Sequence, residues 1–180
     1  ALPILTPDER GTAWWAWAAW IVGAGAYLGS FVWSMAVLPE RVVAHVGPDG
    51  VDRWGSRTEH AVMSVILGLV ILPMPWLFRF AAKPPGTWLN MPHKDYWFAT
   101  PERTAALRHK LFEDGLVFTG LTAAFLALAV QVGVVQETRD PGSSSAWALP
   151  WGLVVYVALT TVWIVLVLRR HRPPVDEPGA

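Results

Sequence analysis

Four long apolar stretches, separated by polar loops that contain proline, constrain the fold of this chain more than any other feature. These stretches cover residues 13–38, 61–82, 111–135 and 147–168. A helix needs about 17–25 apolar residues to cross the hydrocarbon core of a bilayer, and each stretch is long enough. The sequence therefore predicts an all-α integral membrane protein, a four-helix bundle that forms one domain over residues 13–172. We expect residues 1–12 to be an N-terminal cytoplasmic segment and residues 173–180 to be a disordered tail.

The composition agrees with a membrane protein and excludes several classes of function. Charged residues make up 16% of the chain, below the roughly 25% that is usual for soluble domains. Lys and Arg balance Asp and Glu at 14 each, so the charge gives no indication of nucleic-acid binding. The chain has no cysteine, which excludes disulfides, thiolate metal sites and thiol catalysis. The first residues lack the features of a cleaved signal peptide, so we expect the first apolar stretch to be retained.

The distribution of basic residues predicts the orientation of the helices. Four spans place both termini on the same side of the membrane. Lys and Arg are more frequent on that side, which includes the loop at residues 83–110, than in the loops at 39–60 and 136–146. Because basic residues near spans favour the cytoplasm, both termini are predicted to be cytoplasmic. The preference for Arg over Lys, with abundant Ala, Val, Gly and Pro, is typical of a bacterial protein, so we expect the bacterial cytoplasmic (inner) membrane.

Small residues four positions apart predict which helices touch. The pairs are Ala19 and Gly23, Gly25 and Gly29, Gly120 and Ala124, and Ala123 and Ala127. Two pairs lie in the first apolar stretch and two in the third. Because such pairs share one helix face and allow close approach of two backbones, we predict contact between these helices; the alternative is that they only reflect an Ala-rich composition. The residues assigned to helix packing are Gly25, Gly29, Gly120 and Ala124.

Prolines and one glycine predict where the helices bend or begin. Pro73 and Pro75 each lack a backbone donor, so they should kink or end the second helix. Thr100 is a predicted N-cap with Pro101 at the first helical position. The third helix should therefore begin before its apolar stretch, with Gly115 as a candidate bend.

The centres of the four stretches contain no ionisable residue. Because such residues mark ion and proton pathways in membranes, proton-coupled transport by this chain is disfavoured. Gln131 is the most notable polar residue there, and we favour a structural role for it. No recognised catalytic motif is present, so no catalytic residue is assigned. We predict no cofactor and no metal. The alternative is a divalent-cation site formed by His45 and His60 with the neighbouring acidic residues Asp49, Asp52 and Glu59.

The loop at residues 39–60 has a dense polar motif. Its candidate site residues are His45, Gly50, Asp52, Trp54, Ser56 and Arg57. Residues 47–50, Gly-Pro-Asp-Gly, are a strong turn signal. A turn there could bring His45, Asp52 and Trp54 together as an external ligand surface. The alternative is a compact cap in which the indole ring lies on the membrane surface.

The loop at residues 83–110 has a second motif. Its candidate residues are Asn90, Pro92, Lys94, Asp95, Tyr96, Trp97, Glu102 and Arg103. The charged residues could pair across the intervening turn, and the adjacent aromatic residues could anchor the segment at the membrane interface. The alternative to a functional site is an anchored elbow that only connects two helices.

These two motifs resemble the hallmarks of a bacterial membrane family, domain of unknown function sixteen-forty-eight. The resemblance covers residues 34–131 and combines Leu38-Pro39, His45 and the run from Gly50 to Arg57 with the run from Asn90 to Arg103. Val46 and His93 depart from the residues common in the family. A similar region forms the N-terminal part of SdpI-type proteins, which give immunity to a secreted peptide toxin and act as membrane signal receptors. The resemblance implies immunity or sensing, and it carries over no catalytic residue.

The sequence thus favours a non-enzymatic membrane protein of signalling or immunity type. Its expected partners are the lipid bilayer, another membrane protein or a second copy of the chain, and an extracellular peptide. A structural or accessory subunit of a larger membrane complex is the alternative. An enzyme is a third class, for which His45 with Asp52 is the only basis.

Overall fold

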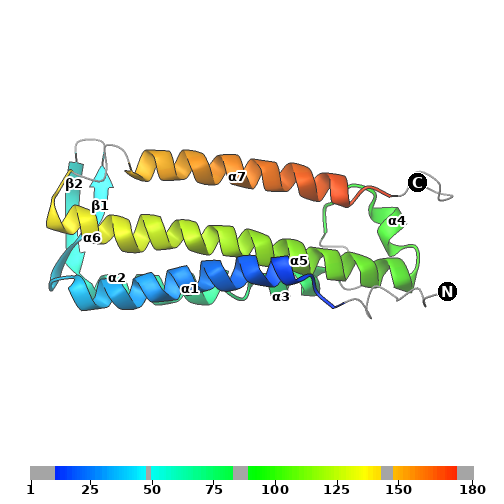
Figure 1. Cartoon of the computed structure of the whole chain (residues 1–180), viewed down its shortest axis with the longest axis horizontal. Helices are drawn as coiled ribbons and strands as arrows, with labels where there is room; N and C mark the ends of the chain where they lie inside the picture. Colours follow the sequence, from blue (N-terminus) through cyan, green and yellow to red (C-terminus); the bar gives the residue numbers. More distant parts are fainter. Residues whose placement is uncertain (1–10, 48–49, 83–88, 143–147, 174–180) are drawn as a thin grey trace.

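The computed structural model describes residues 11–47, 50–82, 89–142 and 148–173. Most of the predicted N-terminal segment and most of the predicted tail lie outside these residues. Figure 1 shows an elongated helical bundle with a β-hairpin at one end. Its elements are α1 (Trp14–Val37), β1 (Arg41–Gly47), β2 (Gly50–Ser56), α2 (Arg57–Ile71), α3 (Met74–Ala81), α4 (Lys94–Phe98), α5 (Pro101–Leu126), the π-helical η1 (Ala127–Val132), α6 (Gly133–Arg139) and α7 (Ala148–Arg170).

The four apolar helices expected from the sequence are confirmed. Long apolar helical segments cover Trp14–Val37, Arg57–Ala81, Pro101–Arg139 and Pro150–Arg170, and each is long enough to cross a membrane. The all-α prediction needs one correction, because β1 and β2 pair as an antiparallel two-stranded sheet in the first loop.

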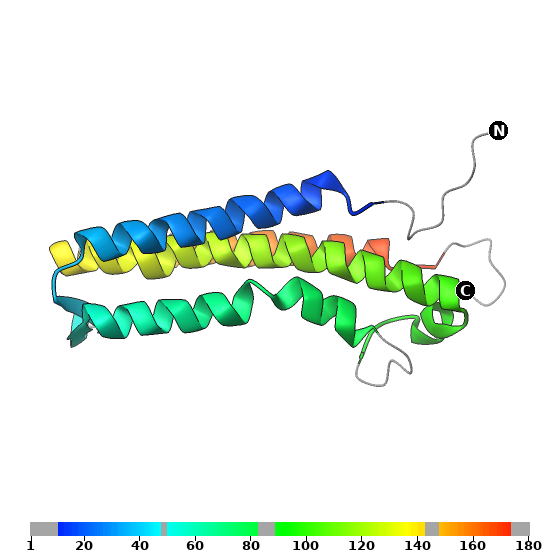
Figure 2. The ribbon, with the colours of Figure 1, turned by 90° about the horizontal axis from the view of Figure 1, so that it is seen from below.

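Helix α5 is the centre of the bundle. It packs against α1, α2, α3 and α7, and Figure 2 shows α1 on one side of it and α2 with α3 on the other. The buried apolar side chains accordingly include Leu107, Leu116 and Ala123 from this helix. The hairpin and α6 lie at one end of the bundle, which we call the hairpin end. The beginning of α1, helix α4 and the last turn of α7 lie at the opposite end, which we call the α4 end.

Contact between the first and third apolar stretches is confirmed, and Gly23 and Gly120, each from one of the predicted pairs, make it. A Cβ atom at Gly23 would lie 2.6 Å from the carbonyl carbon of Gly120, and a Cβ at Gly120 would lie equally close to the carbonyl carbon of Ala19. The backbones of α1 and α5 therefore touch at these residues. The assignment of Gly25 and Gly29 to this contact is wrong, because a Cβ at either position would meet no described atom within 4 Å.

Ala124, the remaining residue assigned to packing, is exposed, whereas Ala123 and Ala127 are buried against Tyr27 of α1. The prediction therefore identified the correct helices. It was right for Gly120 and for the pairs Ala19–Gly23 and Ala123–Ala127, and wrong for Gly25, Gly29 and Ala124.

The predicted break at the prolines is confirmed, since α2 ends at Ile71 and α3 begins at Met74. At the break, the Trp76 N–H donates to the Pro73 carbonyl at 3.1 Å, although a regular helix would direct it to Leu72. The Leu72 carbonyl instead accepts the Trp20 indole N–H at 3.2 Å. A tryptophan of α1 thus satisfies a backbone group that the break in α2 leaves without its regular partner.

Helix α5 begins as predicted, with the Thr100 hydroxyl accepting the Arg103 N–H at 3.3 Å and Pro101 in the first turn. The helix is continuous through Gly115, so the candidate bend is wrong. Gly115 instead leaves room for α3, because a Cβ there would lie 3.0 Å from the Pro75 Cα.

Helix α7 packs on α5 along one narrow stripe. The Tyr156 ring stacks on Phe125 with centroids 4.5 Å apart, and the Trp163 ring stacks on Phe118 at 5.1 Å. The Thr122 and Tyr156 hydroxyls are 3.0 Å apart. The remaining faces of α7 expose large apolar side chains along their whole length.

Candidate functional site

The β-hairpin at the hairpin end forms from a sequence with strand character. Residues 41–47, Arg-Val-Val-Ala-His-Val-Gly, are rich in β-branched side chains. Gly50 has a φ of 108°, which glycine adopts without steric cost, and it begins β2. The hairpin is fixed to the bundle because Val42 is buried against Leu38 and Val135, and the Val43 N–H donates to the Thr138 hydroxyl at 3.0 Å.

The hairpin brings together part of the predicted outer motif. The Nδ1 atom of His45 lies 2.7 Å from a carboxylate oxygen of Asp52, and both side chains are mostly exposed. Trp54 lies on the same strand two residues further, and the guanidinium of Arg41 is 5.2 Å from its ring centroid. His45 and Asp52 are thus in contact, as expected. Trp54, which was expected to join them, instead contacts Arg41.

Other residues of the outer motif connect the hairpin to the helices. Ser56 is the N-cap of α2, since its hydroxyl accepts the Glu59 N–H at 3.0 Å. The Arg57 guanidinium donates to the Leu38 carbonyl at 3.3 Å and forms an ion pair with Glu40. The Arg57 contacts join the end of β2 to the residues that precede β1. The role of Ser56 and Arg57 is therefore structural.

A cavity lies between the hairpin and the helices below it. Its volume is about 340 Å³, and a second cavity of about 270 Å³ shares part of its lining. Apolar side chains from β1, α2, η1 and α6 line most of the first cavity, including Val43, Met63 and Val134. Arg53 and Glu59, which form an ion pair at 2.5 Å, also line it. An apolar cavity with a few polar groups is the usual form of a small-ligand site.

His60 connects this cavity to a buried polar network. It lines the cavity, and its Nε2 atom lies 2.9 Å from the side-chain carbonyl oxygen of Gln131, which has no exposed surface. The same oxygen accepts the Ser34 hydroxyl at 2.8 Å, and the Gln131 amide donates to Ser64 at 2.9 Å. Because an amide oxygen can only accept, His60 is the donor and carries its proton on Nε2.

The network links three helices, since Ser34 belongs to α1, Ser64 to α2 and Gln131 to η1. The Tyr27 hydroxyl of α1 also donates to the Ser64 carbonyl at 2.6 Å. The π-helical segment of the third apolar stretch contains Gln131, and such segments often occur at functional sites. Sequence analysis noted Gln131 but could not find its contact with His60, because the two residues are 71 positions apart.

The metal alternative has little support in the structure. Among the residues that are described, no group of three His, Asp or Glu side chains is close enough to hold an ion. Asp49, one of the acidic residues named with His45, lies outside the described residues.

The inner motif at the α4 end separates into buried and exposed parts. Tyr96 and Trp97 are buried in the core with Leu107. The Arg103 guanidinium lies 4.1 Å from the Tyr96 ring centroid, and the Trp97 indole donates to the His171 carbonyl at 3.1 Å. The exposed members are Asn90, Pro92, Asp95 and Glu102, whereas Lys94 is half-buried. The motif therefore supplies core packing and does not bring all its members into one site.

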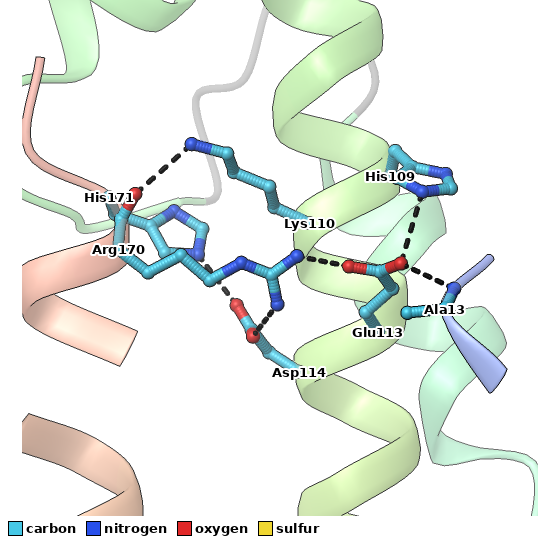
Figure 3. Close-up of polar contacts among 7 residues, drawn as sticks. All are labelled: Ala13, His109, Lys110, Glu113, Asp114, Arg170 and His171. Atoms are coloured by element: carbon cyan, nitrogen blue, oxygen red, sulfur yellow. Dashed lines mark hydrogen bonds and ion pairs between the residues drawn. The ribbon is translucent and has the colours of Figure 1, made fainter. Parts of the chain in front are cut away.

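A cluster of charged residues at the α4 end was not predicted. Figure 3 shows Glu113 and Asp114 of α5 facing Arg170 and His171. The Arg170 guanidinium forms ion pairs with both carboxylates, at 2.8 Å to Asp114, and the His171 Nε2 atom lies 2.6 Å from the other Asp114 oxygen. Glu113 and Asp114 are only 4% and 6% exposed, whereas the Arg170 side chain is 30% exposed, so the pairs are partly buried.

This charged cluster caps two helices. Glu113 accepts the backbone N–H of Ala13 at 2.8 Å and so replaces the missing side-chain cap of α1. Lys110 donates to the Arg170 carbonyl at 3.0 Å, and its Nζ atom is 4.6 Å from the Trp97 ring centroid. Both interactions satisfy backbone groups that helix ends leave without partners. Because the Glu113 and Asp114 oxygens are engaged, we interpret the cluster as structural.

The geometry at the two ends is therefore different: the hairpin end has a lined cavity, and the α4 end has a closed ion network. Comparison with protein-family models, with curated proteins and with solved structures finds no match for this chain.

Proposed function

We propose that this chain is a non-enzymatic, multi-pass protein of the bacterial cytoplasmic membrane that binds an external ligand at its hairpin end. Four helices that are long and apolar enough to cross a bilayer support the membrane location. The exposed apolar side chains that cover these helices, including the whole outer face of α7, also support it. In water, an apolar surface of this extent would be covered by a partner.

The proposed orientation has the α4 end in the cytoplasm and the hairpin outside. Exposed basic residues at the α4 end support it, among them Arg79, Arg169 and Arg172, because basic residues near spans favour the cytoplasmic side. The absence of cysteine from the chain makes the orientation directly testable. Asp52→Cys and Asp95→Cys each introduce a single thiol at an exposed position. A maleimide that does not cross membranes should label only the first in intact cells and both after lysis; equal labelling of both in intact cells would refute the orientation.

The cavity at His60 is the observation that carries the ligand-binding proposal. A ligand that contacts the His60 ring in this cavity would compete with or strengthen its hydrogen bond to Gln131. Because that bond belongs to a network across α1, α2 and η1, the ligand would change the relative stability of two helix arrangements. Sensing requires such a difference in affinity between two states.

An extracellular peptide is the proposed ligand. An apolar peptide side chain would enter the cavity, and polar groups of the peptide would meet the Arg53–Glu59 pair beside it. Immunity to a secreted peptide or signal sensing would follow, as the resemblance to SdpI-type proteins implies. In cells that lack the gene, His60→Ala, Asp52→Ala and Trp54→Ala variants should fail to restore resistance to peptides secreted by the same strain. Full resistance in all three variants, at normal membrane levels, would contradict the proposal.

A structural or accessory subunit of a membrane complex is the second candidate function. The observation that favours it is α7, which packs on α5 and η1 along one stripe and exposes its remaining apolar faces. Purification from native membranes in a mild detergent distinguishes the two candidates. Stoichiometric recovery with a larger assembly would favour the subunit, whereas a monomer or homo-oligomer would favour the sensor.

A further inference from the structure

An apolar groove lies between α1 and the broken helix formed by α2 and α3. Its volume is about 450 Å³, and the side chains along it include Trp20, Phe31, Val65, Leu69 and Trp76. Its polar groups are already bonded, because the Ser64 carbonyl accepts the Tyr27 hydroxyl and the Leu72 carbonyl accepts the Trp20 indole. The groove therefore presents an almost purely apolar wall to whatever fills it.

The shape of the groove indicates a chain-like occupant. From Trp20 to Phe31 the groove follows α1 for about 17 Å, at about 1.5 Å per residue. Half of the hydrocarbon core of a bilayer is roughly 15 Å deep. The length of the groove thus matches one acyl chain in a single leaflet of the bilayer.

The charge beside the groove indicates the headgroup. Arg79 follows Trp76 by three residues, so it lies on the same face of α3 one turn closer to the α4 end. Its side chain is exposed, and its guanidinium is 5.6 Å from the Phe112 ring centroid. Among the described residues, no carboxylate is within ion-pair distance of it. A guanidinium in this position is suited to bind a phosphate group.

We propose that the groove holds one acyl chain of an anionic phospholipid whose headgroup phosphate is bound by Arg79. This lipid site rests on the membrane location proposed above. Acyl-chain carbons would contact the exposed Val65 and Leu69 side chains, and the headgroup would lie on the cytoplasmic side. Pro73 and Gly68 both line the groove. The Tyr27 ring occupies the space beside Gly68, because it lies 3.2 Å from where a Cβ of that residue would be.

Native mass spectrometry of the whole chain, depleted of lipid in a non-ionic detergent, tests this site. The probes are phosphatidylglycerol and phosphatidylcholine with identical acyl chains. Arg79→Gln should lower the affinity for phosphatidylglycerol about fivefold, the usual effect of one basic residue on an anionic headgroup, and should leave phosphatidylcholine binding unchanged. Val65→Trp and Leu69→Trp should lower the affinity for both lipids by more, because the larger side chain fills the groove.

Two matched variants serve as controls, since Arg169 is exposed on α7 and Val70 is exposed on α2 away from the groove lining. Arg169→Gln and Val70→Trp should bind both lipids as the unmodified chain does. Equal effects of Arg79→Gln and Arg169→Gln, or unchanged binding in Leu69→Trp, would overturn the site. Circular dichroism in detergent identifies a groove variant that fails to fold. If Val65→Trp or Leu69→Trp fails, lipid binding by the other one tests the site.

Flotation of the chain with liposomes separates this inference from the proposed function. A chain that does not float contradicts the membrane location itself. A chain that floats, but whose Arg79 and groove variants bind lipid normally, contradicts only the lipid site.

Discussion

Replacing Gly23 by alanine tests the close contact between α1 and α5, the most extensive helix interface in the bundle. The added Cβ would lie 2.6 Å from both the Cα and the carbonyl carbon of Gly120. Backbone atoms cannot move aside as a flexible side chain can. The two helices must therefore separate, and the packing on both sides of the contact must loosen with them.

The expected cost follows from two opposing effects. Alanine is about 1 kcal/mol more favourable than glycine in a helix interior, whereas overpacking a close contact costs roughly 1–3 kcal/mol. Gly23→Ala has both effects. Gly25→Ala has only the first, because its Cβ would meet no described atom within 4 Å. The free energies of unfolding of these two variants should differ by the overpacking cost, about 1–3 kcal/mol.

The assay is reversible unfolding in mixed micelles of dodecyl maltoside and SDS, followed by far-UV circular dichroism. Gly29→Ala is a second control in the same helix, with open space around its Cβ. Gly120→Ala should be as destabilising as Gly23→Ala, because its Cβ would meet the Ala19 backbone. If Gly23→Ala and Gly25→Ala were equally stable, the backbones would not touch at Gly23, and this account of the interface would be refuted.

The same titration tests two further predictions about buried polar residues. Gln131→Leu removes the acceptor and donor that join three helices, so it should lower the free energy of unfolding by about 2–4 kcal/mol, since each unsatisfied buried group costs about 1–3 kcal/mol. Exposed Gln136→Leu should have little effect, and equal stability of the two leucine variants would contradict the network. Asp114→Asn removes one of the two carboxylates that pair with Arg170 in a partly buried site, so it should cost about 1–3 kcal/mol. Exposed Asp140→Asn is its control, and equal stability of these two variants would show that the ion pair does not hold the α4 end together.

The features that were predictable from the sequence depend on neighbouring residues. Helix length and apolarity indicated the four helical segments, the missing donor of Pro73 indicated the break, and Thr100 with Pro101 indicated the start of α5. Each of these sequence signals affects only residues that are close to it in the chain. Gly47 and Gly50 pair across the hairpin, which agrees with the turn signal between them. The strands themselves were not predicted, although residues 41–47 are rich in β-branched side chains.

The features that were missed depend on pairs of residues far apart in the chain. Glu113 and Asp114 are near the start of the third apolar stretch, and their partners Arg170 and His171 are more than 50 residues away. The choice between Gly23 and Gly25 depends on the rotation of α1 about its own axis. That rotation is set by packing, because every face of α1 is apolar and the small residues are spread around it.

The charged cluster at the α4 end has a consequence for how the protein is made. Glu113 supplies the cap of α1, although 100 residues separate it from Ala13, and the same turn of α5 holds the end of α7 through Asp114. Ribosomes deliver the chain from its N-terminus, so α1 is synthesised 100 residues before its capping carboxylate. This end of the bundle therefore assembles late, after the chain has been made as far as the end of α7.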